Sequence, residues 1–329
     1  MRSICISIVA TLALAGTSFA DTITVCQSGC DYSDITSALE HASNGDVIEI
    51  TPDDPMGYMP FTIDNHLTIT INGNGATIQG KEGMDMGGVF VEGGVTVTIN
   101  DLRIAGNAAE SGGGIFVEGG ATVTLSNCTI TDNSAGEGGG MFVEGGATVT
   151  LNNCTISGNT AGSSGGGIYC GGSSPTIRDC HITDNRVTDE FAFAGGGISA
   201  IGSSNPHLIG GTVSGNTNFL GFPANLWGGV TQSLRGEQSE LGTIILEDST
   251  VCGTGEYNIT GVLIEHRGEN HISDCVDEGD LNGDGAIDST DLDAMHAAVG
   301  ICTSDVNHDG DTNVLDLLGV IDEWGGVCP

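Results

Sequence analysis

Apolar and polar residues alternate with a period of two over much of the chain. Residues 121–131 read ATVTLSNCTIT, and Gly, Asn and Asp clusters bound the run on both sides. A period of two places successive side chains on opposite faces of a strand, whereas helical faces repeat every 3.6 residues. The pattern therefore predicts strand–turn–strand units. Glycine lacks a three-residue period, which excludes collagen, and the β-branched runs exclude a flexible linker.

These units repeat along the chain. An aromatic residue recurs at a nearly constant interval, at Phe90, Phe116, Phe142 and Tyr169. An asparagine recurs at the same interval, and once more after a longer one, at Asn107, Asn133, Asn159, Asn185 and Asn216. One unit cannot bury its own apolar face, so copies must stack. We expect an all-β, right-handed parallel β-helix over residues 21–266, in which 46–266 form about eight turns or roughly 40 Å, with glycines at the corners and the asparagines bonded between turns.

The first edge of such a stack needs a cover. Residues 33–45 predict a short capping helix, with Ile35, Ala38, Leu39 and Ala42 on its apolar face. Ser33 or Asp34 would cap its start, and Gly45 would end it. The run 23–50 resembles the opening of pectin-lyase-like β-helix proteins, and the GGGI…N turns resemble the glycine-rich repeats of that superfamily. The resemblance spans roughly residues 22–266 and implies a fold rather than a chemistry.

The first twenty residues read as a secretory signal peptide, with Arg2, an apolar core and a small-residue end at Ala20. No later apolar run has the length of a membrane helix. We therefore expect a secreted protein, extracellular or attached to a cell surface. A formal net charge of −36 would repel nucleic acids and anionic membranes, and acidic polysaccharides too unless a cation bridges them.

The cysteines fit export, because an even number remains once Cys5 leaves with the leader. Cys26 and Cys30 are close enough in sequence to form a local disulfide. Cys128, Cys154 and Cys180 recur at the interval of the repeat. Two explanations stay open for them: disulfides between adjacent turns, or small buried residues that stack in the core.

Beyond residue 266 the repeat ends, and two acidic loops follow, DLNGDGAIDSTD (280–291) and DVNHDGDTNVLD (305–316). Oxygen ligands at loop positions 1, 3, 5, 9 and 12, with glycine at 6 and a backbone carbonyl at 7, are the spacing of a calcium-binding loop. The first loop offers Asp280, Asn282, Asp284, Ala286, Asp288 and Asp291. The second offers Asp305, Asn307, Asp309, Asp311, Asn313 and Asp316.

Paired loops that end in Asp, each followed by an apolar helix, resemble a dockerin domain over residues 277–329, after a linker at 267–276. The terminal EWGGVC resembles a cysteine-ended subtype of that family. The resemblance implies Ca²⁺ as cofactor and a cohesin module on a scaffold or surface protein as partner. It assigns cohesin contacts to Ser289, Thr290, Val314 and Leu315.

No catalytic signature appears in the repeats. Basic residues are scarce, no Asp-Asp pair occurs outside Asp53-Asp54, and no nucleophile triad can be nominated. Insertions lengthen one corner after Asn185 and Asn216, where solenoids usually carry binding loops. Together the insertions carry the charged residues Asp184, Arg186, Asp189 and Glu190 and the aromatics Phe191, Phe193, Phe219, Phe222 and Trp227. These residues form either a satellite core or a ligand site.

A second candidate surface follows from the alternation in IFVE. Ile115 and Val117 share one face and Phe116 and Glu118 the other, and an unpaired glutamate is costly to bury. We therefore expect an outward ladder of Phe90, Phe116, Phe142 and Tyr169 beside Glu92, Glu118 and Glu144. It would bind a neutral glycan or a partner, or else only stiffen the sheet. The sequence favours a dockerin-anchored β-helix with a carbohydrate-binding or structural role; a polysaccharide lyase or glycoside hydrolase is the alternative.

Overall fold

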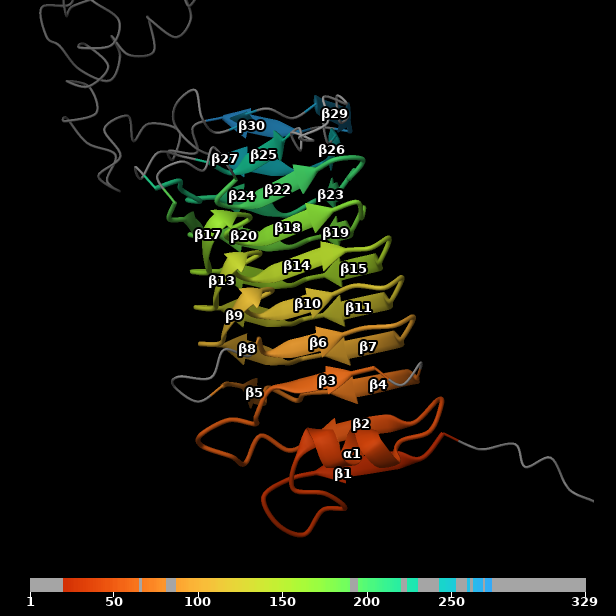
Figure 1. Cartoon of the computed structure of the whole chain (residues 1–329). Coiled ribbons are helices and arrows are strands. Elements are labelled where there is room, and N and C mark those ends of the chain that lie inside the picture. Colours follow the sequence, from red (N-terminus) through yellow and green to blue (C-terminus); the bar gives the residue numbers. More distant parts are fainter. Residues whose placement is uncertain are drawn as a thin grey trace, which may run out of the picture.

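The computed structural model describes residues 20–64, 67–80, 87–189, 195–219, 224–229, 243–252, 259–260, 263–268 and 270–273. These residues form a stack of short parallel strands, which Figure 1 shows as successive turns of a solenoid. Four sheets run along the stack, and we name them A to D. No helix in the described ranges is long and apolar enough to cross a membrane.

Sheet A is the longest and has ten strands. In spatial order they are β1 (Thr22–Val25), β2 (Val47–Ile50), β4 (Thr68–Asn72), β7 (Thr96–Asn100), β11 (Thr122–Ser126), β15 (Thr148–Asn152), β19 (Thr176–Arg178), β23 (His207–Ile209), β26 (Thr243–Glu247) and β29 (Leu263–Arg267). Sheet B comprises β5 (Thr77–Ile78), β8 (Arg103–Ala105), β12 (Thr129–Thr131), β16 (Thr155–Ser157), β20 (His181–Thr183), β24 (Thr212–Ser214), β27 (Thr250–Cys252) and β30 (His271–Ser273).

Sheets C and D complete each turn. Sheet C comprises β3 (Phe61–Ile63), β6 (Val89–Val91), β10 (Ile115–Val117), β14 (Met141–Glu144), β18 (Ile168–Gly171), β22 (Ile198–Ile201), β25 (Leu226–Gly229) and β28 (Ile259–Thr260). Sheet D comprises β9 (Ala108–Ser111), β13 (Ser134–Glu137), β17 (Thr160–Ser164) and β21 (Arg186–Val187). Pairing continues through β30, inside the segment 267–276 that the sequence assigned to a linker.

The core lies between sheets A, B and C, where the period-two pattern turns its apolar residues inward. One column in sheet B consists of Ile78, Ile104, Ile130, Ile156 and Ile182, all buried. Because each turn buries such residues only against its neighbours, the turns are stable as a stack and not singly. Complete burial of each Ile or Leu side chain contributes about 1.5–3 kcal/mol.

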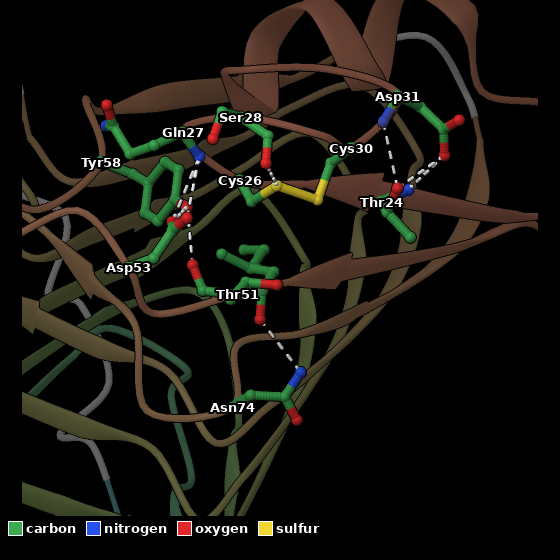
Figure 2. Close-up of a disulfide and its surroundings, with 11 residues drawn as sticks. Thr24, Cys26, Gln27, Ser28, Cys30, Asp31, Thr51, Asp53, Tyr58 and Asn74 are labelled. Atoms are coloured by element: carbon green, nitrogen blue, oxygen red, sulfur yellow. Dashed lines mark hydrogen bonds between the residues drawn. A yellow bond between two sulfur atoms is a disulfide. The ribbon is translucent and has the colours of Figure 1, made fainter.

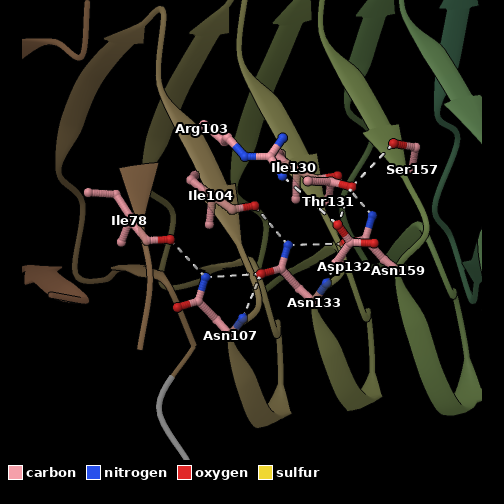
Figure 3. A network of polar contacts seen from close by, with 10 residues as sticks. All are labelled: Ile78, Arg103, Ile104, Asn107, Ile130, Thr131, Asp132, Asn133, Ser157 and Asn159. Carbon is pink, nitrogen blue, oxygen red and sulfur yellow. Dashed lines mark hydrogen bonds and ion pairs between the residues drawn. The ribbon is translucent and has the colours of Figure 1, made fainter. Parts of the chain in front are cut away.

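The expected asparagine ladder is confirmed, and it joins the turns through buried amides (Figure 3). The side-chain amide of Asn133 donates to Asn159 Oδ1 and to the Ile104 carbonyl, each at 3.0 Å. Its own Oδ1 accepts from the backbone N–H and the side-chain amide of Asn107, both at 3.0 Å. A Cβ on Gly114 would lie 3.0 Å from Asn133 Nδ2 and 2.6 Å from Ile130. The tight glycine corner and the ladder therefore depend on each other.

Helix α1 (Ile35–His41) forms inside the predicted range, but it ends at His41 with Ala42 as its C-cap, and not at Gly45. Asp34, and not Ser33, is the N-cap, and its carboxylate accepts from the Ser37 N–H at 2.8 Å. The helix packs against β1 and β3, with Ile35, Ala38 and Leu39 buried and Ala42 half-buried at the C-cap. That it protects the end of the solenoid from edge pairing stays a prediction.

The Cys26–Cys30 disulfide is confirmed and closes the loop after β1 (Figure 2). Cys128, Cys154 and Cys180 are buried free thiols, which decides between the two explanations in favour of stacked core residues. Hydrogen bonding to Cys154, together with burial, raises the pKa of the Cys128 and Cys180 thiols. Cys170 is a further buried free thiol, and burial raises its pKa to about 12.

Candidate functional site

The aromatic ladder lies on the outer face of sheet C, as alternation predicts. Strand β10 buries Ile115 and Val117 completely and leaves Phe116 half-buried. Ring centroids are 5.1 Å apart from Phe90 to Phe116, 5.2 Å from Phe116 to Phe142 and 4.6 Å from Phe142 to Tyr169. The rings of the last two pairs are stacked and nearly parallel, with interplanar angles of 1° and 3°. Parallel strands in register produce this column.

Stacking limits what the ladder can bind. The faces of the internal rings are covered by their neighbours, and Phe142 is only 4% exposed. Phe90, Phe116 and Tyr169 are half-buried. A sugar that needs a free aromatic face would find it only at the two ends of the column. Column stacking is a direct contribution to sheet stability.

Acidic side chains border the ladder. Glu92, Glu118 and Glu144 are half-buried at the ends of their strands, where the sequence places them. Burial first, and then the carboxylates of Glu137 and Glu144, raise the pKa of Tyr169 to about 12. Glu137 belongs to β13 of sheet D and was not singled out from the sequence. It could have been, because it immediately precedes the glycine corner one turn before Tyr169.

The lengthened corner is described only in part. Asp184, Arg186 and Asp189 are exposed, and Asp184 has a left-handed backbone with φ of 56°. Arg186 Nη2 donates to the Phe219 carbonyl at 3.2 Å, which ties the two insertions together. Glu190, Phe191, Phe193 and Phe222 lie outside the described residues, as does the side chain of Trp227. The choice between satellite core and ligand site therefore stays open.

A polar pocket lies on the outer side of sheet B and was not predicted. It has a volume of about 380 Å³. Its lining comprises Asp54, Pro55, Gly57, Thr77, Gln79, Arg103, Ala105, Gly106 and Asp132. Arg103 also borders a neighbouring hollow of about 330 Å³ around Asn74, Asp101 and Asn127. We call the first of these the corner pocket.

Local backbone geometry positions the charged groups of the corner pocket. Arg103 begins β8, and Asp132 follows β12 with a left-handed φ of 56°. Arg103 Nη2 lies 3.9 Å from Asp132 Oδ2, and Figure 3 shows the two side chains side by side. The positions equivalent to Asp132 in the adjacent turns are Gly106 and Gly158. A Cβ at Gly158 would lie 2.8 Å from Asp132 Oδ1, so glycine there leaves room for the carboxylate.

Asp54 approaches from the loop between β2 and β3. The Met56 N–H and the Gln27 side-chain amide hold its carboxylate, at 2.9 and 2.5 Å. The corner pocket thus presents carboxylate acceptors from Asp54 and Asp132 beside donors from Arg103 and Gln79. Such convergent polar groups suit a ligand with several hydroxyls. The sequence could not show that these residues line one pocket, because they come from a loop and from corners of different turns.

The calcium and cohesin residues predicted at 280–316, like the signal peptide at 1–19, lie outside the described residues. Within the described part of the chain, no group of three or more His, Cys, Asp or Glu side chains could hold a metal ion.

Comparison with known proteins addresses the fold. A crystal structure of the pectin methylesterase from Aspergillus niger is similar to the chain, with 14% identity and a TM-score of 0.42. That similarity covers 86% of this chain and 97% of the other. A second crystal structure of the same esterase, in deglycosylated form, has a TM-score of 0.38 and 14% identity, with the same coverage. No curated protein sequence matches. Residues 67–277, well over half of the chain, match the Beta_helix family, described as a right handed beta helix region, and the protein therefore belongs to that family.

Proposed function

We propose that the β-helix is a carbohydrate-binding module and that the corner pocket is its binding site. The observation that carries this proposal is the convergence of Arg103, Gln79, Asp54 and Asp132 on one open pocket of about 380 Å³. Sugar hydroxyls both donate and accept, and the pocket offers both kinds of partner within the width of one or two sugar rings.

Charge favours a neutral sugar. The chain has a formal net charge of −36, and two carboxylates flank the one arginine of the pocket. A polymer of uronic acids would meet repulsion from the whole surface and only one local cation. Neutral hydroxyls avoid that cost and can pair with the carboxylates through charge-assisted hydrogen bonds.

Calorimetric titration of the full chain with a panel of neutral oligosaccharides tests the pocket. Arg103→Gln and Asp132→Asn should each weaken binding by about tenfold, the loss of roughly one charge-assisted hydrogen bond. Arg178→Gln is the matched control, because Arg178 is an exposed arginine on β19 outside the pocket. Equal loss in the control, or binding that is indifferent to both pocket variants, would remove the proposal.

We further propose that residues 277–329 form a calcium-loaded dockerin that attaches the exported β-helix to a cohesin-bearing scaffold or surface. The support is the sequence: two intact loops, at 280–291 and 305–316, offer oxygen ligands at the same loop positions. Without a cation, the crowded aspartates repel one another and should keep this segment open. At a hundredfold excess over Kd, each bound ion should add about 2.7 kcal/mol of stability.

Circular dichroism of the full chain during calcium titration tests the anchor. Because α1 is the one helix among the described residues and has seven residues, added helix signal would report the C-terminal segment. Asp280→Ala with Asp305→Ala should abolish both that signal and capture on immobilised cohesin modules. An unchanged spectrum in chelator and in calcium would refute the anchor and leave the pocket proposal standing.

A catalytic role is the alternative function of the same pocket. Two carboxylates near one arginine are among the groups that glycoside hydrolases use. Release of reducing ends from any neutral polysaccharide, abolished by Asp132→Asn or by Asp54→Asn, would establish it. Binding without turnover would leave the module non-catalytic.

A further inference from the structure

Sheet A carries a regular array of threonines on its outer face. Strands β4, β7, β11 and β15 each contain the motif Thr-x-Thr, and they are consecutive neighbours in the sheet. The first row consists of Thr68, Thr96, Thr122 and Thr148, and the second of Thr70, Thr98, Thr124 and Thr150. We call these eight residues the threonine face. The register between the four strands has no shift.

The hydroxyls of the threonine face have no partner among the described residues. The first row is exposed and the second half-buried, while the residues between them point into the core. Within the described ranges none of the eight hydroxyls makes a hydrogen bond to the chain, although the backbone N–H of Thr68 donates to Asn44 Oδ1 at 2.8 Å. A third row, of Asn72, Asn100, Ser126 and Asn152, extends the same polar surface. Among the described residues, the array thus presents eight hydroxyls that are exposed or half-buried and have no hydrogen-bond partner.

Charge is missing from these four strands, although the chain as a whole is very acidic. The chain has 43 Asp and Glu residues, yet the strands read TITIN, TVTIN, TVTLS and TVTLN. The neighbouring strands restore charge, with Glu49 in β2 and Arg178 in β19. Charged groups hold their own hydration shells and disturb ordered water, whereas small hydroxyls and methyls do not.

The spacing of the array has two repeats. Neighbouring strands lie about 4.8 Å apart, and residues i and i+2 of one strand lie about 6.6 Å apart. The spacing between strands is close to the shortest oxygen–oxygen repeat in the planes of hexagonal ice, and the spacing along a strand is somewhat shorter than the repeat along the c axis of ice. We propose that the threonine face binds ice, with hydroxyls hydrogen-bonded to lattice water and the γ-methyls seated in the hollows between.

A contact with an ice surface requires that the threonine face be flat. Sheets ordinarily twist, and the exceptions are held by stacking or by side-chain ladders. Here the buried asparagine ladder and the stacked rings of sheet C hold successive turns in constant register. Figure 1 shows β4, β7, β11 and β15 lying one above another with little change of direction. Many weak contacts can then form at once against a rigid lattice.

A crystalline polysaccharide is the other rigid, regular surface that could lie on this face. Its sugar rings are bound best by aromatic faces, and these four strands carry no aromatic residue. Lattice water needs only hydroxyls at the right spacing, which the face supplies. The array therefore favours ice.

Slow freezing of the full chain onto an ice shell, with the partition into ice measured, tests the proposal; ice recrystallisation in sucrose solution gives a second readout. The wild type should enter ice and keep crystals small, while Thr124→Lys should lower the partition at least tenfold. Thr155→Lys is the matched control, since Thr155 is an equally half-buried threonine on β16 of sheet B. Thr124→Val, which keeps the shape, checks the hydroxyl if the lysine variant fails to fold.

Three results would overturn the proposal: exclusion of the wild type from ice, equal loss in Thr155→Lys, or a Thr124→Val protein that binds ice as the wild type does. Sedimentation with crystalline cellulose or chitin forms the parallel arm. Binding there that Thr124→Lys abolishes, without retention in ice, assigns the face to polysaccharide and also overturns the proposal. The results of the ice and polysaccharide assays do not bear on the corner pocket, which is tested with a different ligand and different variants.

Discussion

The asparagine ladder makes a sharp prediction about stability, which the substitution Asn133→Ala tests. The change removes four hydrogen bonds, two donated by the Asn133 amide and two accepted by its oxygen. The backbone N–H of Asn107 loses the partner it has at 3.0 Å and is buried. Asn107 Nδ2 keeps its bond to Ile78, and Asn159 Oδ1 keeps the bond from the Asn133 N–H.

The magnitude follows from that inventory. One buried donor left without a partner costs about 1–3 kcal/mol, and each other lost bond about 0.5–1.5 kcal/mol. The free energy of unfolding should therefore fall by at least about 2.5 kcal/mol, a large fraction of a domain's stability. Asn100→Ala is the matched control, because its amide also bonds the preceding turn, to Asn72 Oδ1 at 2.9 Å, but both residues are only half-buried. Water can replace that bond, so we expect a cost of about 0.5–1 kcal/mol.

Urea unfolding followed by far-ultraviolet circular dichroism measures both variants, and hydrogen exchange of the Asn107 amide reports local opening of the ladder. Exchange matters because a solenoid can open at one turn while the rest stays folded. The reasoning is refuted if Asn133→Ala costs no more than Asn100→Ala and leaves the Asn107 amide protected. The ladder would then be a consequence of stacking and not one of its causes.

Three further predictions concern the outer face and the thiols. The raised pKa of Tyr169 means that the folded state holds the phenol proton more tightly than the unfolded chain does. The stability of the folded state should therefore decline as pH rises from about 10 to about 12. Tyr169→Phe should flatten that decline when the melting temperatures of variant and wild type are compared over this pH range. Phe142→Ser should cost about 3 kcal/mol and Phe116→Ser less, with oligosaccharide binding retained; a binding loss at unchanged melting temperature would instead assign the ladder to recognition. Iodoacetamide labelling mapped by mass spectrometry should leave Cys154 and Cys170 unmodified in the folded protein, and rapid labelling of either would contradict their burial.

Features that repeat could be predicted from the sequence. The spacing of Asn107, Asn133 and Asn159 was enough to expect bonded amides, and the alternation in IFVE placed Phe116 outward. The same reasoning found α1 and the Cys26–Cys30 disulfide, because each depends on contacts within a few residues. Local contacts and regular periodicity are what a sequence displays directly.

Features that depend on contacts between segments outside the repeat pattern, or on the packing of one side chain against another, could not be predicted from the sequence. Sheet D was not foreseen as a separate sheet, because its strands (SAGE in β13) lack the apolar alternation that marks the other three. Phe142 was expected to offer a face, yet its neighbours cover it, since burial in a column depends on ring orientation. The corner pocket needed the loop around Asp54 to lie beside β8, which no spacing encodes.

A repeat also shows where function departs from architecture. In the column on sheet B that contains Thr77, Thr129 and Thr155, the threonines are interrupted by Arg103, His181 and His271, and the corner pocket lies at Arg103. Sheet A shows the opposite behaviour over four strands, where both threonine positions are retained without exception. A residue that differs from the rest of its column is expected where a few side chains contact a small ligand. The same residue in every turn is expected where a whole surface matches a lattice. The two sites therefore predict different mutational profiles. Oligosaccharide binding should depend on the few polar groups of the corner pocket, Arg103 and Asp132 among them, and ice binding should decline step by step as threonines are replaced by valine. A single threonine whose loss abolished retention in ice, while its neighbours proved dispensable, would contradict the lattice match itself.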